Sequence, residues 1–206
     1  MKKLVALFAL VLLIPLNGIS QNLDKIDYIS PFNDGLASVK KGNEWGFINT
    51  NGDLVIAFRE DLVLSKVGAL SYPIFSNERC LITEELNGIS YFGYINTTGK
   101  TIIEPQFLNA TNFNESKAIA LELVKKNLGT NNLLDKPVVS YDYFEVVIDV
   151  NGNILHYLMT EPIHITLSKK FIRHPPNITT RLLSNGAYAI LGKNKKWEIR
   201  KFKLTQ

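Results

Sequence analysis

The stretch Glu44-Trp45-Gly46-Phe47-Ile48-Asn49-Thr50-Asn51-Gly52-Asp53 contains the pattern that decides the fold. It returns as YFGYINTTGK at residues 91–100 and, more altered, as EVVIDVNGN at residues 145–153. Gly52, Gly99 and Gly152 mark the same place in these three copies, at intervals of 47 and 53 residues. Such self-similarity is typical of a repeat architecture, in which each copy is one structural unit.

A second signature precedes each copy. It begins as Phe32-Asn33-Asp34-Gly35-Leu36-Ala37 and has counterparts at residues 75–82, 113–120 and 183–190, the last of which precedes a shortened fourth copy at Trp197. We therefore expect four units, at about residues 28–70, 71–110, 111–160 and 178–206. We also expect two irregular insertions, one at 125–140 within the third unit and one at 160–178 between the third and fourth units, because both are rich in Asn, Gly or Pro. The second insertion contains one candidate strand, Ile163 to Leu167.

Each unit reads as a β-hairpin with an approach strand. Residues alternate along 45–48, so that Trp45 and Phe47 share one face of a strand. Gly52 stands where a hairpin turn needs a positive φ. Gly46 lies mid-strand, which predicts the close approach of an aromatic ring or of backbone. Since one hairpin cannot bury its own apolar face, we expect an all-β array of about four divergent hairpin repeats, open like a solenoid or partly closed.

This pattern resembles the WG-repeat family of bacterial β-repeat proteins. The residues that define the repeat are Phe32, Gly35, Trp45, Gly46, Gly52, Phe92, Gly93, Gly99, Gly152 and Trp197. The third copy departs from the pattern, with Glu145 and Val146 in place of Trp and Gly, and the fourth has Glu198 in place of Gly. The resemblance implies a β-repeat scaffold and brings no catalytic activity with it.

Residues 1–20 are typical of a secretory signal peptide. Lys2 and Lys3 precede an apolar run from Leu4 to Leu16, and small residues before Gln21 predict cleavage between Ser20 and Gln21. A retained N-terminal anchor is the alternative, although the run is shorter than the roughly 20 residues that span a bilayer. We expect residues 21–206 to form one exported domain, periplasmic or extracellular, with no membrane span after cleavage.

No residue pattern indicates catalysis. The sequence lacks nucleophile and phosphate-loop motifs, and neighbouring carboxylates such as Glu84 and Glu85 point to opposite faces of a strand. The three histidines, His156, His164 and His174, are too widely spaced for common metal signatures. We therefore predict a non-enzyme with no cofactor and no metal. The competing hypothesis is a hydrolase with an unrecognised polar site on the same scaffold.

The single cysteine and the aromatic residues each allow two interpretations. Cys80 is expected to be a buried thiol, the alternative being a reactive thiol that pairs between molecules. The aromatics are expected in the core rather than in a carbohydrate-stacking surface, with Tyr141-Asp142-Tyr143 as the best exposed exception. These aromatics are Trp45, Phe47, Phe92, Tyr94, Tyr141, Tyr143, Phe144 and Trp197.

The charge of the chain is unevenly distributed. Residues 21–161 contain 11 Lys and Arg against 18 Asp and Glu, whereas residues 162–206 contain 10 against 1. The sequence leaves three roles open for the basic end: a surface for an unknown protein or anionic envelope polymer, a soluble cap, or a complement to the acidic portion. A nucleic-acid partner is not expected for an exported protein. The predicted binding residues are Lys169, Lys170, Arg173, Lys193, Lys195, Lys196, Arg200 and Lys201.

Overall fold

The computed structural model describes residues 23–131, 135–184, 186–192 and 194–202, and these form strands and turns without a helix. The all-β prediction is therefore confirmed. The predicted signal peptide and its cleavage site lie outside the described residues. No helix that could cross a membrane occurs in the described ranges.

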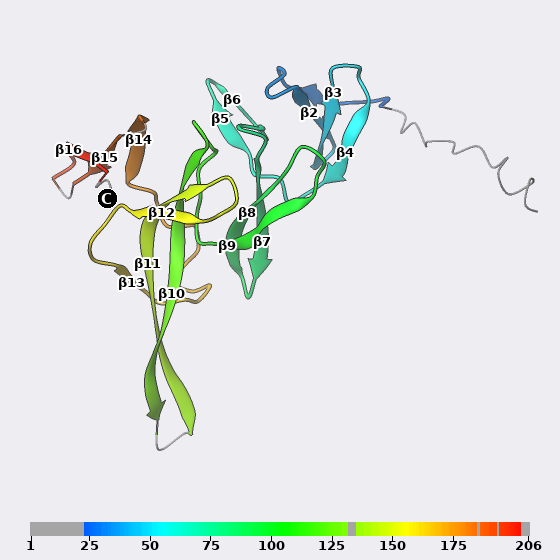
Figure 1. Ribbon diagram of the computed structural model, residues 1–206. Helices are drawn as coiled ribbons and strands as arrows, with labels where there is room; N and C mark the ends of the chain where they lie inside the picture. Colours follow the sequence, from blue (N-terminus) through cyan, green and yellow to red (C-terminus); the bar gives the residue numbers. More distant parts are fainter. Residues whose placement is uncertain (1–22, 132–134, 185, 193, 203–206) are drawn as a thin grey trace, which may run out of the picture.

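The first two units form separate antiparallel sheets (Figure 1). The first sheet has the order β1-β2-β3-β4, and the second has the order β7-β8-β9, with the small hairpin β5-β6 between them in sequence. The strands are β1 (Tyr28–Ile29), β2 (Leu36–Lys41), β3 (Glu44–Asn49), β4 (Leu54–Arg59), β5 (Ser65–Val67), β6 (Leu70–Tyr72), β7 (Cys80–Leu86), β8 (Ile89–Ile95) and β9 (Thr101–Phe107).

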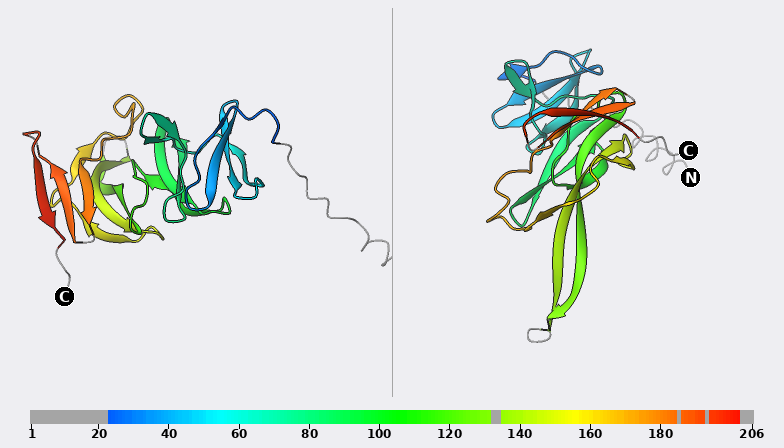
Figure 2. Two further views of the ribbon diagram at one scale, coloured as in Figure 1. Left: turned by 90° about the horizontal axis from the view of Figure 1, so that it is seen from above. Right: turned by 90° about the vertical axis from the view of Figure 1, so that its left-hand side faces the viewer.

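The last two units continue this plan. In the third sheet β11 pairs with β10, β12 and β13, and the fourth sheet has the order β14-β15-β16. The strands are β10 (Lys117–Asn131), β11 (Lys136–Asp149), β12 (Ile154–Tyr157), β13 (Ile163–Ile165), β14 (Thr180–Ser184), β15 (Ala187–Leu191) and β16 (Trp197–Lys201). The units follow one another from β1–β4 at one end to β16 at the other, so the array is open (Figure 2, left).

The hairpin turns of the first three units share one hydrogen-bonding pattern. In the first, the side-chain oxygen of Asn49 accepts bonds from the N–H groups of Asn51 and Asp53, both at 2.9 Å. Asn96 and Asp149 accept the equivalent bonds in the next two turns. The turn glycines have positive φ, as predicted: Gly52 at 85°, Gly99 at 81° and Gly152 at 86°.

The mid-strand glycines lie beneath bulges in the return strands. β4 bulges opposite Gly46, and β9 bulges opposite Gly93. A Cβ atom on Gly93 would lie 2.3 Å from the carbonyl oxygen of Ile103 and 2.7 Å from the nitrogen of Pro105. The predicted close approach is therefore confirmed, and the approaching group is backbone rather than an aromatic ring.

The third unit shows why the glycine can be replaced. Val146 occupies the position of Gly46 and pairs with Tyr157 of β12, and the neighbouring pair of Val147 with His156 continues the same regular register. Without a bulge above it, the Val146 side chain fits completely into the core. The glycine is thus required by the bulge rather than by the hairpin itself.

The first three units meet at aromatic contacts that we call inter-unit joints. The ring of Phe47 lies 4.7 Å from that of Phe75 in the second unit, and the ring of Tyr94 lies 4.8 Å from that of Phe113 in the third. All four side chains are buried. Phe75 and Phe113 each begin the signature that precedes a hairpin, so this signature attaches its unit to the unit before it.

Hydrogen bonds between successive turns accompany each joint. The Asn33 side chain donates to the carbonyl of Phe75, and the Ser76 hydroxyl donates to the carbonyl of Phe113. The Asp34 carboxylate accepts a 2.9 Å bond from the backbone N–H of Glu78, and Asn77 accepts the corresponding bond in the next unit. The same contact is thus built twice, with polar and apolar parts in the same relative places.

The insertion predicted at 125–140 is not an irregular loop. β10 and β11 continue through most of it as a two-stranded ribbon that projects from the array (Figures 1 and 2, right). A register shift between Asn127 and Gly129 absorbs one extra residue at Leu128, and Pro137 lies opposite Thr130. A ribbon with both faces in solvent tolerates Asn, Gly and Pro, since most of its side chains need not enter a core.

The segment at 160–178 separates the third and fourth units, and it also covers part of the core. β13 pairs with β11 inside this segment, which confirms the candidate strand at its start. Ile165, Leu167 and Ile172 pack against a cluster that contains Leu121 and Tyr143. The segment therefore encloses a hydrophobic cluster that the hairpins alone leave open.

Candidate binding surface

The predicted basic residues separate into two groups. Lys169, Lys170 and Arg173 lie in the segment between β13 and β14, against the second unit. Lys195 and Lys196 lie in the turn before β16, while Arg200 and Lys201 lie on β16 itself. Lys193 lies outside the described residues. Lys169 and Arg173 line one cavity, and Arg200 and Lys201 line another, so the structure does not gather all the predicted residues into one site.

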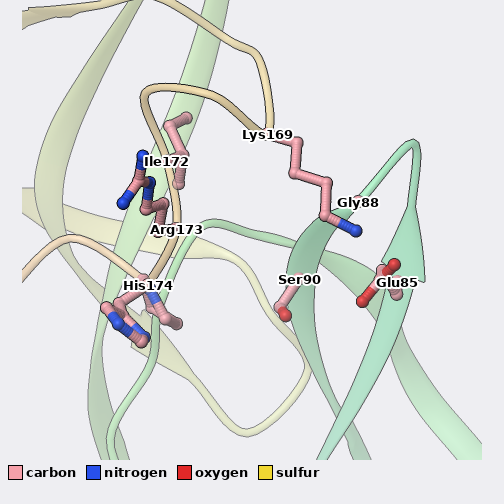
Figure 3. A pocket seen from close by; sticks show the side chains of 8 residues that line it. Glu85, Gly88, Ser90, Lys169, Ile172, Arg173 and His174 are labelled. Atoms are coloured by element: carbon pink, nitrogen blue, oxygen red, sulfur yellow. The ribbon is translucent and has the colours of Figure 1, made fainter.

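Two residues of the first group, Lys169 and Arg173, border a cavity of about 180 Å³ at the β7–β8 turn. A Cβ atom on Gly88 would lie 2.5 Å from Cδ of Lys169, so the lysine stem packs directly on this turn. In Figure 3 the Lys169 side chain runs over Gly88 toward Glu85, whereas Arg173 and His174 point away from this pair. An acidic side chain at the cavity and divergent cations make it a poor anion site.

The second group lies on and immediately before the edge strand β16 at the end of the array. All five residues of β16 are exposed, and the turn that precedes it holds the exposed Lys195 and Lys196. Arg200 makes a 2.9 Å ion pair with Glu198, whose hydrogen bond raises the pKa of the arginine. Arg200 and Lys201 also border a cavity of about 470 Å³ between β12 and the last hairpin.

Trp197 is exposed, contrary to the prediction that the repeat aromatics form the core. Its side chain is 45% accessible, and the guanidinium carbon of Arg181 lies 4.7 Å from its ring centroid. The equivalent Trp45 and Phe92 are buried, because the following unit covers the face on which each of them lies. In the part of the chain that the structure describes, no unit follows the fourth.

The tyrosines predicted as an exposed exception are also placed differently. Tyr143 is 8% accessible and Asp142 is 7% accessible, since the 160–178 segment covers this part of β11. Asp142 accepts bonds from Lys126 at 2.7 Å and from His164 at 3.1 Å, and these bonds lower the pKa of its carboxyl. Asp142 and Tyr143 are therefore not exposed as predicted, whereas Tyr141 remains partly accessible.

The remaining candidates for chemistry are scattered. His156 stacks on Phe202 with ring centroids 4.7 Å apart, and His164 bonds to Asp142. Within the described ranges no three His, Cys, Asp or Glu side chains gather in a way that could hold a metal. Cys80 is free and buried, and burial raises the pKa of its thiol. It occupies the place that Ala37 has in the first unit.

Sequence reasoning missed one buried carboxylate. Glu145 replaces the tryptophan of the repeat, and its Oε1 accepts bonds from the backbone N–H of Thr179 at 2.6 Å and from the Thr179 hydroxyl at 2.7 Å. These bonds fasten the end of the 160–178 segment to β11. The signal available in the sequence was the departure itself, because a charged residue at a core position of a repeat needs a polar partner.

The sheets, turns and joints define an all-β repeat protein with a basic terminal hairpin. A family model described as "WG containing repeat" matches residues 25–45, 45–59 and 92–122. The match places WG-type repeats in the first two units and at the start of the third. No curated protein and no solved structure matches the chain.

Proposed function

We propose that this chain is an exported, non-catalytic interaction module of the bacterial cell envelope, and that its fourth unit binds an anionic partner. The supporting observation is the exposure of β16 together with its charge. Arg200 and Lys201 lie on a fully exposed strand, and Lys195 and Lys196 precede it. Four cations along one short edge attract a polyanion or an acidic protein more strongly than dispersed surface lysines do.

Export is the second part of the proposal, and it rests on the leader-like composition of residues 1–20. N-terminal sequencing of the protein recovered from outside the cytoplasm of expressing bacteria tests it directly. We expect the recovered chain to begin at Gln21. A chain that retains Met1 and stays in the cytoplasmic fraction would contradict export.

Binding is tested by retention on the producing cell's envelope fraction over a salt series. The variant K195Q/K196Q/R200Q/K201Q removes the charge of the terminal hairpin without touching a buried residue. A matched control, K41Q/K66Q/K100Q/K125Q, removes the same charge from exposed positions elsewhere. We expect retention of the wild type and the control to fade as the screening length falls from about 8 Å at physiological salt to about 3 Å at 1 M.

The terminal-hairpin variant should not be retained at any salt concentration. Equal retention of both variants would show that net charge rather than the fourth unit is responsible. Absence of retention for the wild type would leave the basic hairpin with the role of a soluble cap.

A further inference from the structure

The two ends of the array expose complementary halves of the inter-unit joint. At the first end, Phe32 occupies the position of Phe75 and Phe113, which are 1% and 2% accessible at their joints. Phe32 itself is 50% accessible. It begins the same signature, but the described part of the chain places no hairpin aromatic against it. Phe32 thus exposes a surface that is covered in the second and third units, whereas Leu183, its counterpart in the fourth unit, is 52% accessible.

At the last end, the strand register identifies the other half. In the first unit Ser38 pairs with Phe47, the aromatic residue of the first joint. In the fourth unit Ala189, the counterpart of Ser38, pairs with Ile199. Ile199 therefore occupies the position of Phe47 and Tyr94, and it is 73% accessible, against 1% and 0% for those two residues.

The ends are also complementary in charge. Residues 23–64 of the first unit contain 4 Lys and Arg against 7 Asp and Glu. Residues 180–202 of the fourth unit contain 6 Lys and Arg against 1 Glu. Attraction between these ends favours an encounter in which the fourth unit of one molecule meets the first unit of another, and it disfavours like ends meeting.

We propose that copies of this chain associate head to tail, with Ile199 of one copy packed against Phe32 of the next. The contact repeats the geometry of the internal joints, where a hairpin side chain packs on the phenylalanine that heads the following unit. Because the two surfaces differ and lie at opposite ends of an open array (Figure 2, left), the association does not stop at a dimer. The small size of one joint makes it weak and dependent on concentration.

The test uses two variants, each with one altered end. F32S removes the first half of the joint and I199S removes the second, and both side chains are exposed, so the fold should be retained. Sedimentation velocity is measured on the protein as recovered from expressing cells, from about 1 µM to about 1 mM, the range of weak association. We expect the average mass of the wild type to rise without a plateau, while each variant alone stays monomeric.

Mixing the two variants gives the sharpest result. F32S keeps a functional last end and I199S keeps a functional first end, so an equimolar mixture should form dimers and nothing larger. The control L128S removes an apolar side chain that is 64% accessible on the ribbon, away from both ends, and should associate like the wild type. Circular dichroism and urea midpoints equal to those of the wild type establish that the variants are folded.

Three outcomes would overturn the proposal: a wild type that stays monomeric throughout, single variants that still associate, or a mixture that forms no dimer. This proposal and the proposed envelope binding can be refuted separately. F32S keeps every basic residue, so it should lose self-association while its retention on envelope remains salt-dependent.

Discussion

The close approach of backbone at Gly93 allows a quantitative test of why the repeat contains a glycine. In a Gly93→Ala variant the new methyl group would lie 2.3 Å from the carbonyl oxygen of Ile103, about 1 Å short of the 3.4 Å at which ordinary contact begins. The opposing atoms belong to the bulge of β9, so they cannot move aside as a flexible side chain does. Gly46→Ala is milder, since its nearest atom, the carbonyl oxygen of Ile56, would lie 2.8 Å away.

The expected cost follows from these distances. Overpacking lowers the free energy of unfolding by roughly 1–3 kcal/mol. Replacing Gly with Ala also restricts the unfolded chain, which offsets about 0.4–1 kcal/mol of this loss. We expect Gly93→Ala to lower the free energy of unfolding by about 2 kcal/mol and Gly46→Ala by about 1 kcal/mol. If the free energy of unfolding falls by about 2 kcal/mol per molar urea, the loss in Gly93→Ala corresponds to a shift of the urea midpoint of roughly 1 M.

The assay is urea unfolding followed by far-ultraviolet circular dichroism. Gly186→Ala is the matched control, because a Cβ atom there meets nothing within 4 Å and the residue does not have a positive φ. Its stability should stay within about 0.5 kcal/mol of the wild type. Should Gly93→Ala prove as stable as Gly186→Ala, or Gly46→Ala prove the more damaging of the two, close approach would not be the reason for the glycine.

Three further predictions concern the joints and the titratable groups. Phe75→Ala should lower stability by about 3–5 kcal/mol, and Phe32→Ala by less than about 0.5 kcal/mol, in the same urea assay, because only Phe75 is buried. The pKa of Asp142 is lowered by hydrogen bonds from Lys126 and then His164, so its carboxylate stabilises the fold above the ordinary pKa of about 3.9. Thermal unfolding should therefore show Asp142→Asn less stable than the wild type at pH 7, with the difference lost as the pH falls through the lowered pKa; a difference that persists at pH 2 would contradict this. Burial raises the pKa of Cys80, so an aromatic disulfide reagent at pH 8 should label this thiol only after unfolding, and prompt labelling of the folded protein would contradict its burial.

The hairpins could be predicted from the sequence because their signals are local. Gly52 and its counterparts each complete a turn whose hydrogen bonds come from residues within four positions. The alternation of Trp45 and Phe47 with smaller residues then assigns the two aromatic rings to one face of the strand, and this face packs in the cluster shared with the second unit. Repetition strengthens these signals, because a wrong assignment of a strand or turn in one copy conflicts with the assignments in the other copies.

The ribbon and the covered tyrosines could not be predicted in this way. Asn127, Gly129 and Pro137 are turn-forming residues, yet they lie in strands that are stabilised by pairing with each other rather than by burial. The burial of Tyr143 depends on a segment whose residues follow it by more than twenty positions. Neither the pairing nor the covering leaves a local pattern in the chain.

The sequence identifies the basic residues of the candidate site, but it does not predict how they are arranged in space. Net charge singled out the C-terminal residues as candidates, because charge can be counted without knowing the fold. The separation of Lys169 from Arg200 could not be predicted from composition, because it depends on the 160–178 segment turning back toward the second unit.

The ribbon of β10 and β11 has a mechanical consequence. From Lys117 to Asn127 its pairing has no register shift, so the outer part is continuous with strands whose inner residues, such as Ala120 and Val146, are completely buried. A pull on the exposed outer end is therefore transmitted as torque to the packing of the third unit. A molecule that binds the outer end of the ribbon is therefore mechanically coupled to the hydrophobic core of the third unit.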